Sequence, residues 1–157
     1  MILGTAEYTA KMNYTTDKCK SCERQQTTAV ETLQHLITSC PQLEELWEGL
    51  QEWEPFVMLD LDLTNQNILL WHRKKDAGQE LTINIVLILV KYYIFKCKLS
   101  SQPPRIGPAK IYIKKYCNWI SQSLTLKDKK HYLDLFINDN YNYYANVMGK
   151  ILPIALA

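Results

Sequence analysis

The sequence lacks the short motifs by which common hydrolases and nucleotide-binding enzymes are identified. Its 157 residues include only five glycines, and none belongs to a phosphate-binding Gly-x4-Gly-Lys-Ser/Thr loop. There is also no Gly-x-Ser-x-Gly nucleophile turn and no His-Glu-x2-His metalloprotease pair. One carboxylate pair, Asp60 and Asp62, is spaced like a polymerase magnesium site, but this spacing is more typical of the solvent face of a strand. We therefore expect no enzymatic activity in this chain alone.

Long apolar runs are also missing. The longest, residues 83–95, is interrupted by Asn84 and Lys91 and is well short of the ~20 residues that a bilayer-spanning helix needs. The first residues contain no apolar stretch of the kind found in a signal peptide. We therefore expect no membrane partner and a buried core helix over residues 83–95.

Cysteine is present five times, and three of these residues share a short segment with a histidine. The order is Cys19-x2-Cys22, twelve residues, His35, four residues and Cys40. These separations are typical of small zinc sites, in which Zn²⁺ takes four N or S ligands at tetrahedral corners. Four protein ligands leave no position open for water or substrate. The sequence therefore predicts one structural zinc ion with four ligands: Cys19, Cys22, His35 and Cys40.

The alternative is that these three cysteines are small buried side chains and that His35 lies at the surface. Thr28 and Glu31 have the spacing of a capping box, which predicts a helix start just before the histidine and favours the metal. The apolar face expected for this helix comprises Val30, Leu33 and Ile37. Reduced thiols and a metal site suit a nuclear or cytoplasmic location better than a secreted disulfide framework. The two remaining cysteines are expected to be buried free thiols: Cys97 and Cys117.

The fold class expected for the whole chain is mainly α, with a small CCHC zinc module followed by a helical region and at most short strands. Helices are predicted from Pro41 to about Trp53, from 79 or 80 to 98, from 108 to 123, and from a Thr125–Asp128 cap to 137. Glu54-Pro55 is expected to end the first of these. Alternating apolar and acidic residues over 56–62 predict a short strand or extended connector. His72 and His131 are expected at the surface.

The chain is accordingly divided into five segments. Residues 1–16 are interpreted as the remnant of an upstream segment, and residues 17–54 as the zinc-binding module. A connector follows over 55–78, then a helical region over 79–146 and a tail over 147–157.

Charge is distributed unevenly along the chain, although the net charge is only +2. Residues 1–62 hold four Lys/Arg and eleven Asp/Glu, which gives −7, while residues 63–157 hold fourteen and five, which gives +9. Such asymmetry predicts a basic surface for a polyanion, and lysines interleaved with aromatic residues suit nucleic acid. The alternative is a set of ordinary solvated helix faces. The candidate nucleic-acid-binding residues are Lys91, Lys96, Lys98, Lys114 and Lys115.

Two motifs in this order resemble a known family. The zinc motif with Glu31-Thr-Leu-Gln-His35-Leu, Cys40-Pro and Leu46-Trp47 resembles the zinc-binding segment downstream of the polymerase in non-LTR (LINE-type) retrotransposon reverse transcriptases. The stretch 88–98, Ile-Leu-Val-Lys-Tyr-Tyr-Ile-Phe-Lys-Cys-Lys, is similar to a motif that follows that segment. The resemblance covers about residues 17–120. It implies the C-terminal region of a polyprotein whose endonuclease and polymerase lie upstream, and a role in gripping element RNA or target DNA.

Two functions from different classes remain open on the sequence. The first is a zinc-stabilised module that binds RNA or DNA through lysines and aromatic residues. The second is a structural or protein-interaction domain that docks on the upstream reverse transcriptase region through its apolar helix. A non-functional retroelement remnant is a further interpretation.

Overall fold

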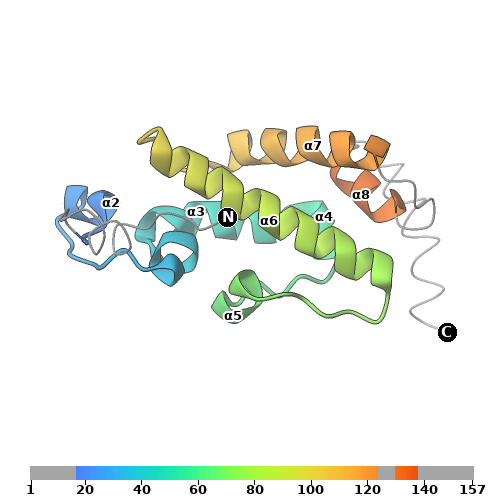
Figure 1. Cartoon of the computed structure of the whole chain (residues 1–157), viewed down its shortest axis with the longest axis horizontal. Helices are drawn as coiled ribbons and strands as arrows, with labels where there is room; N and C mark the ends of the chain where they lie inside the picture. Colours follow the sequence, from blue (N-terminus) through green and yellow to red (C-terminus); the bar gives the residue numbers. More distant parts are fainter. Residues whose placement is uncertain (1–16, 124–129, 138–157) are drawn as a thin grey trace.

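The computed structural model describes residues 17–123 and 130–137, and this part of the chain is helical (Figure 1). Within it there is no strand, and the one pairing of extended backbone is an antiparallel bridge between Lys18 and Val30. The helices in chain order are α2 (Lys20–Arg24), η1 (His35–Ser39), η2 (Pro41–Leu43), α3 (Glu44–Gln51), α4 (Glu54–Met58), α5 (Asn65–Leu69), α6 (Ala77–Leu99), α7 (Ile106–Ser123) and α8 (Lys130–Ile137). The predicted fold class is confirmed.

The long helices α6 and α7 form the body of the molecule and run beside each other, with α8 packed against both (Figure 1). The carboxylate of Asp76 accepts a hydrogen bond from the Gln79 N–H at 2.8 Å and so caps the start of α6. The connection to α7 is held by Tyr93, whose hydroxyl donates to the Arg105 carbonyl at 3.1 Å and accepts from the Arg105 N–H at 3.2 Å. The bounds of both helices lie close to those predicted from the sequence.

The apolar core lies where the short helices α3 and α4 meet the long ones. Leu46 and Leu50 of α3 are fully buried, as are Ile83 of α6 and Ile113 of α7. Three aromatic rings join α4 and its preceding residue to α8, with centroids 5.4–5.9 Å apart: Trp53, Phe56 and Phe136. The helices over the segment predicted to be helical from Pro41 to about Trp53 bury five apolar side chains: Leu43, Leu46, Trp47, Leu50 and Trp53.

The expected short strand or extended connector over residues 56–62 is wrong. The helix predicted from Pro41 does end before Glu54-Pro55, with α3 at Gln51, but a further helix, α4, begins there. Pro55 lies in the first turn of α4, where a missing N–H costs no helical hydrogen bond, and Trp53 is the extended N-cap. The chain leaves α4 through Asp60, whose φ of 48° is left-handed. The segment 55–78 therefore contains two short helices, α4 and α5, that contribute buried side chains to the core.

The helix predicted from a capping box at Thr28 is also wrong in its start and in its face. Thr32 is the capping residue, since its hydroxyl accepts the His35 N–H at 3.0 Å. Residues 29–31 are extended instead and bond to residues 17–19, through Cys19 N–H to Ala29 O and Glu31 N–H to Asp17 O. The later start rotates the apolar face, so Leu33 is exposed while Leu36 and Ile37 are buried. Val30 is exposed as well.

Candidate metal centre

The four predicted ligands are placed by two short segments that face each other. Cys19 is the N-cap of α2 and Cys22 lies within it, so one tight turn presents both thiols. His35 begins the π-helix η1 and Cys40 follows its end. The Cys40 N–H donates to the His35 carbonyl at 2.9 Å, an i→i+5 bond that places these residues one turn apart. The fold therefore brings the two pairs together.

The ligand atoms form a compact group. The Cys40 Sγ lies 4.0 Å from the Sγ of Cys19 and 4.0 Å from that of Cys22, and the Cys22 Sγ lies 3.3 Å from His35 Nε2. All four atoms lie within 4.8 Å of one another. The three thiols are buried and His35 is half-buried. Such a Cys3His group can hold a metal ion, as the spacing predicts.

Burial shifts the pKa values of three of these side chains. It raises the pKa of the Cys22 thiol, and it raises the pKa of the Cys40 thiol to about 12. Burial lowers the pKa of His35, so its imidazole is neutral near neutral pH. Thiols must lose their protons to bind a metal, and a divalent cation supplies the charge that makes this loss favourable in a buried site.

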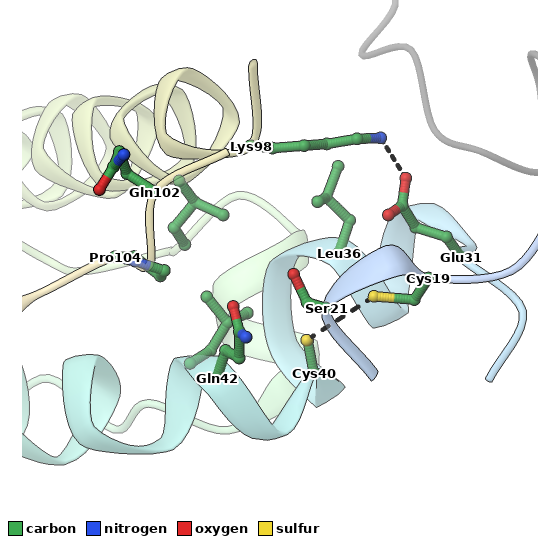
Figure 2. Close-up of a pocket in the computed structure, with 11 residues that line it drawn as sticks. Cys19, Ser21, Glu31, Leu36, Cys40, Gln42, Lys98, Gln102 and Pro104 are labelled. Carbon is green, nitrogen blue, oxygen red and sulfur yellow. Dashed lines mark hydrogen bonds and ion pairs between the residues drawn. The ribbon is translucent and has the colours of Figure 1, made fainter. Parts of the chain in front are cut away.

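An ion pair between a buried carboxylate and a partly exposed ammonium lies beside the thiols and joins residues 17–43 to α6. The carboxylate of Glu31, a residue 4% exposed, pairs with the ammonium of Lys98 at the end of α6 (Figure 2). The sequence pattern placed Glu31 in a capping box and Lys98 among the nucleic-acid contacts. No local pattern could reveal the pair, because the two residues are 67 positions apart.

A cavity of about 40 Å³ lies between this ion pair and the cluster, lined by Cys19, Cys40 and the end of α6 (Figure 2). Binding sites for small organic ligands are several times larger, on the order of 300–1,000 Å³. This cavity is therefore smaller than such sites, whereas a more open hollow of about 400 Å³ borders the other side of Cys40, between η1, α3 and α5.

The five candidate nucleic-acid lysines are in different environments. Lys91 is half-buried and its ammonium donates to the Leu69 carbonyl at 3.4 Å, while Lys98 pairs with Glu31. Lys114 is half-buried on α7. Lys96 and Lys115 are exposed, with ammonium groups 5.4 Å from the ring of Tyr112 and 5.9 Å from that of Tyr116. The structure therefore brings Lys96 and Lys115 to one aromatic surface; their contact with nucleic acid stays a prediction.

His72 was expected at the surface, and that expectation is wrong. The residue is 8% exposed, and its backbone N–H and carbonyl are both bonded by the Asn84 side chain, at 2.8 and 3.0 Å. Among the described residues, its Nε2 atom has no hydrogen-bond partner. The expectation of buried free thiols at Cys97 and Cys117 is confirmed, and burial raises both pKa values, that of Cys117 to about 12.

Some sequence expectations concern residues outside the described ranges. These are the side chain of His131, the cap over 125–128, the segments 1–16 and 147–157, and the region beyond residue 137. The carboxylates of Asp60 and Asp62 are described and both residues are exposed.

No protein-family model, curated protein or solved structure matches this chain. The resemblance to the zinc-binding segment of LINE-type reverse transcriptases therefore depends on the sequence motifs alone and stays a prediction. Among the described helices, none combines the length and apolar character needed to cross a membrane.

Proposed function

We propose that this chain is a zinc-stabilised nucleic-acid-binding module. In this proposal the Cys3His group is a structural metal centre and the exposed face of α6 and α7 contacts RNA or DNA. The role is binding and not catalysis. The parent protein would be a LINE-type reverse transcriptase, and its upstream region would be a second partner of this chain. The location would be the nucleus or the cytoplasm.

Zinc is the metal that the ligand set favours. Thiolate and imidazole ligands in a tetrahedral arrangement are typical of zinc. Zinc–sulfur bonds of about 2.3 Å give sulfur–sulfur edges of about 3.8 Å in a tetrahedron, and the two Sγ–Sγ distances of 4.0 Å are close to that edge. Metal analysis of the purified protein should find one zinc per chain. A lack of bound zinc in protein refolded with an excess of the metal would exclude the centre.

The observation that carries the nucleic-acid proposal is the pairing of cations with tyrosine rings on one face. Lys96 of α6 lies over Tyr112, Lys115 lies over Tyr116, and the two tyrosine rings are 4.5 Å apart. After Glu80, the sequence of α6 and α7 contains six lysines and no carboxylate. Phosphates provide the matching negative charge, and bases provide flat faces for the rings.

The test is a fluorescence-anisotropy titration with RNA, single-stranded DNA and duplex DNA at several salt concentrations. We expect the logarithm of the affinity to fall linearly with the logarithm of salt. In Lys96→Gln/Lys115→Gln the slope for a single strand should be smaller by about 1.4, from ~0.7 per lost phosphate contact. The matched control is Lys20→Gln/Lys75→Gln, which removes two exposed lysines that lie outside α6 and α7. An unchanged slope in the folded Lys96/Lys115 variant would refute the proposed surface.

A second candidate function, docking on another protein, is favoured by exposed apolar side chains on the same helices. Ile88 is 53% exposed on α6, and Leu99 and Ile111 are each 70% exposed. Where exposed apolar side chains form a contiguous patch, they often mark a protein contact. Apolar docking depends little on salt, so the same salt series separates the two functions.

A further inference from the structure

The exposed aromatic residues on α6 and α7 point to a particular form of nucleic acid. We infer that Tyr92 and Trp119, together with the Tyr112–Tyr116 pair, form a stacking platform for unpaired bases, so that the partner is a single strand. This inference rests on the proposed function, because it concerns the same face. To nucleic-acid binding in general, this inference adds base stacking and a preference for single strands over duplex.

The platform has a rigid base. Tyr112 stacks at a tilt of 44° on Tyr93, with ring centroids 5.7 Å apart, and Tyr93 is 8% exposed and bonded to Arg105. Tyr116 continues the row at 4.5 Å from Tyr112. The outer rings are therefore supported by a ring that belongs to the core, which keeps their orientation without a bound partner.

Two further aromatic side chains extend this row and are not used by the core. Trp119 is 64% exposed and follows Tyr116 by three residues and Tyr112 by seven, which places all three on one side of α7. Tyr92 is 38% exposed on α6. It lies one helical turn before Lys96, whose ammonium is over the Tyr112 ring, so Tyr92 is on the side of α6 that borders the row.

The size of the row fits a few nucleotides. Seven residues of helix from Tyr112 to Trp119 rise about 10 Å, which is about three times the ~3.4 Å rise per nucleotide of stacked bases. Lys115 lies one helical turn from Trp119 and over the Tyr116 ring, so its ammonium can move from the ring to a phosphate as a base stacks. In a duplex the base faces are covered by their neighbours and are not available to these rings.

The experiment compares three probes of equal length on the zinc-loaded chain. They are a fluorescein-labelled mixed-sequence DNA strand, the same strand with abasic sites in place of its central bases, and the matching duplex. We expect the intact strand to bind at least about tenfold more tightly than the abasic strand, from the loss of stacked bases. Trp119→Ala should reduce the affinity for the intact strand by roughly tenfold and leave the abasic strand unchanged. Trp119→Phe should retain most of the affinity.

The matched control is Trp71→Ala, which removes a tryptophan of similar exposure, 54%, from the loop before α6. Its affinity for all probes should equal that of the wild-type chain. Zinc content and circular dichroism verify that each variant is folded. The stacking platform would be refuted by equal affinity for the intact and abasic strands, or by an equal loss of affinity for all three probes in Trp119→Ala. Either result would still be consistent with nucleic-acid binding. Failure of every probe to bind would overturn both proposals.

Discussion

Residues 17–43 and the α6–α7 pair contain different kinds of side-chain contact, although they pack against each other. The first segment has short helices, and two of its large apolar residues, Val30 and Leu33, are exposed. This segment contains the cluster of three thiols and one imidazole. Helices α6 and α7 have 23 and 18 residues, and their facing side chains form a continuous apolar core. A metal ion can stabilise a short segment with little core, whereas long helices can be held by apolar burial.

The contact between the two regions involves charge, unlike the thiol–imidazole cluster of the first region and the apolar core of the second. It includes one charged pair, Glu31 with Lys98, beside a small cavity. A pair with a buried carboxylate is costly when it loses one partner, because the remaining charge is left without compensation. We therefore expect the stability of the protein to respond differently to loss of the metal, loss of core contacts and loss of this charged pair.

The largest effect should follow removal of the metal ligands. In Cys19→Ser/Cys40→Ser we expect loss of bound zinc and unfolding of residues 17–43, since structural zinc contributes on the order of 10–16 kcal/mol in finger peptides. Amide hydrogen exchange should lose protection there and retain it in α6 and α7. Metal content measures the first effect. The control is Cys97→Ala, a buried cysteine outside the cluster, which should keep one zinc per chain; full zinc in the double variant would disprove the ligand assignment.

The next effect should come from the aromatic core of the helical region. Phe136 is fully buried and its ring meets those of Trp53 and Phe56. Phe136→Ala should lower the free energy of unfolding by about 3–5 kcal/mol through a cavity and lost contacts. Urea denaturation at saturating zinc measures the loss. Zinc affinity of the folded protein should change little, and a variant that lost its zinc before its helices would contradict the separation of the two regions.

A smaller effect is expected at the contact between the regions. Glu31→Gln should lower the free energy of unfolding by about 1–3 kcal/mol, because a buried carboxylate partner of Lys98 is lost. Lys98→Gln should act through the same pair, so the effects of the two substitutions should not add in a double-mutant cycle. Additive effects would show that the pair does not couple the regions. The same measurement on Lys96→Gln, an exposed lysine nearby, should show little change.

The smallest effect should be a pH dependence at His72. Burial chiefly lowers its pKa from the ordinary 6.5 and nearby Lys74 and Lys91 lower it further, while a hydrogen bond with the Asn67 backbone and the charge of Asp62 act in the opposite direction. The folded state therefore holds His72 neutral, while the unfolded chain takes up a proton as the pH falls below 6.5. Stability should be full above that pH and decrease below it, by at most about 1.4 kcal/mol per pH unit for one group.

His72→Gln should flatten this decrease in urea denaturation measured between pH 7 and 5. His35 also has a pKa lowered by burial, but it is present in both chains and cancels in the difference. Parallel pH profiles for the two chains would contradict the assignment.

A large part of the fold could be predicted because its signals are local. The lengths of α6 and α7 follow from apolar periodicity and from the Pro-rich stop near residue 103, and the structure confirms them within a few residues. The start of η1 could not be predicted in the same way. Thr28 and Thr32 are both acceptable caps, and the pairing of residues 29–31 with 17–19 decided between them.

The sequence by itself determined the candidate ligands and the helical class. Spacing is a property of the chain, and a tight Cys-x2-Cys turn with a following His-x4-Cys can converge on one ion in few ways. Only the tertiary structure decided that Lys98 meets Glu31, that His72 is buried, and that Lys96 and Lys115 lie over a row of tyrosines. Most of these arrangements depend on packing between separate elements, and local periodicity does not specify which faces of two elements meet.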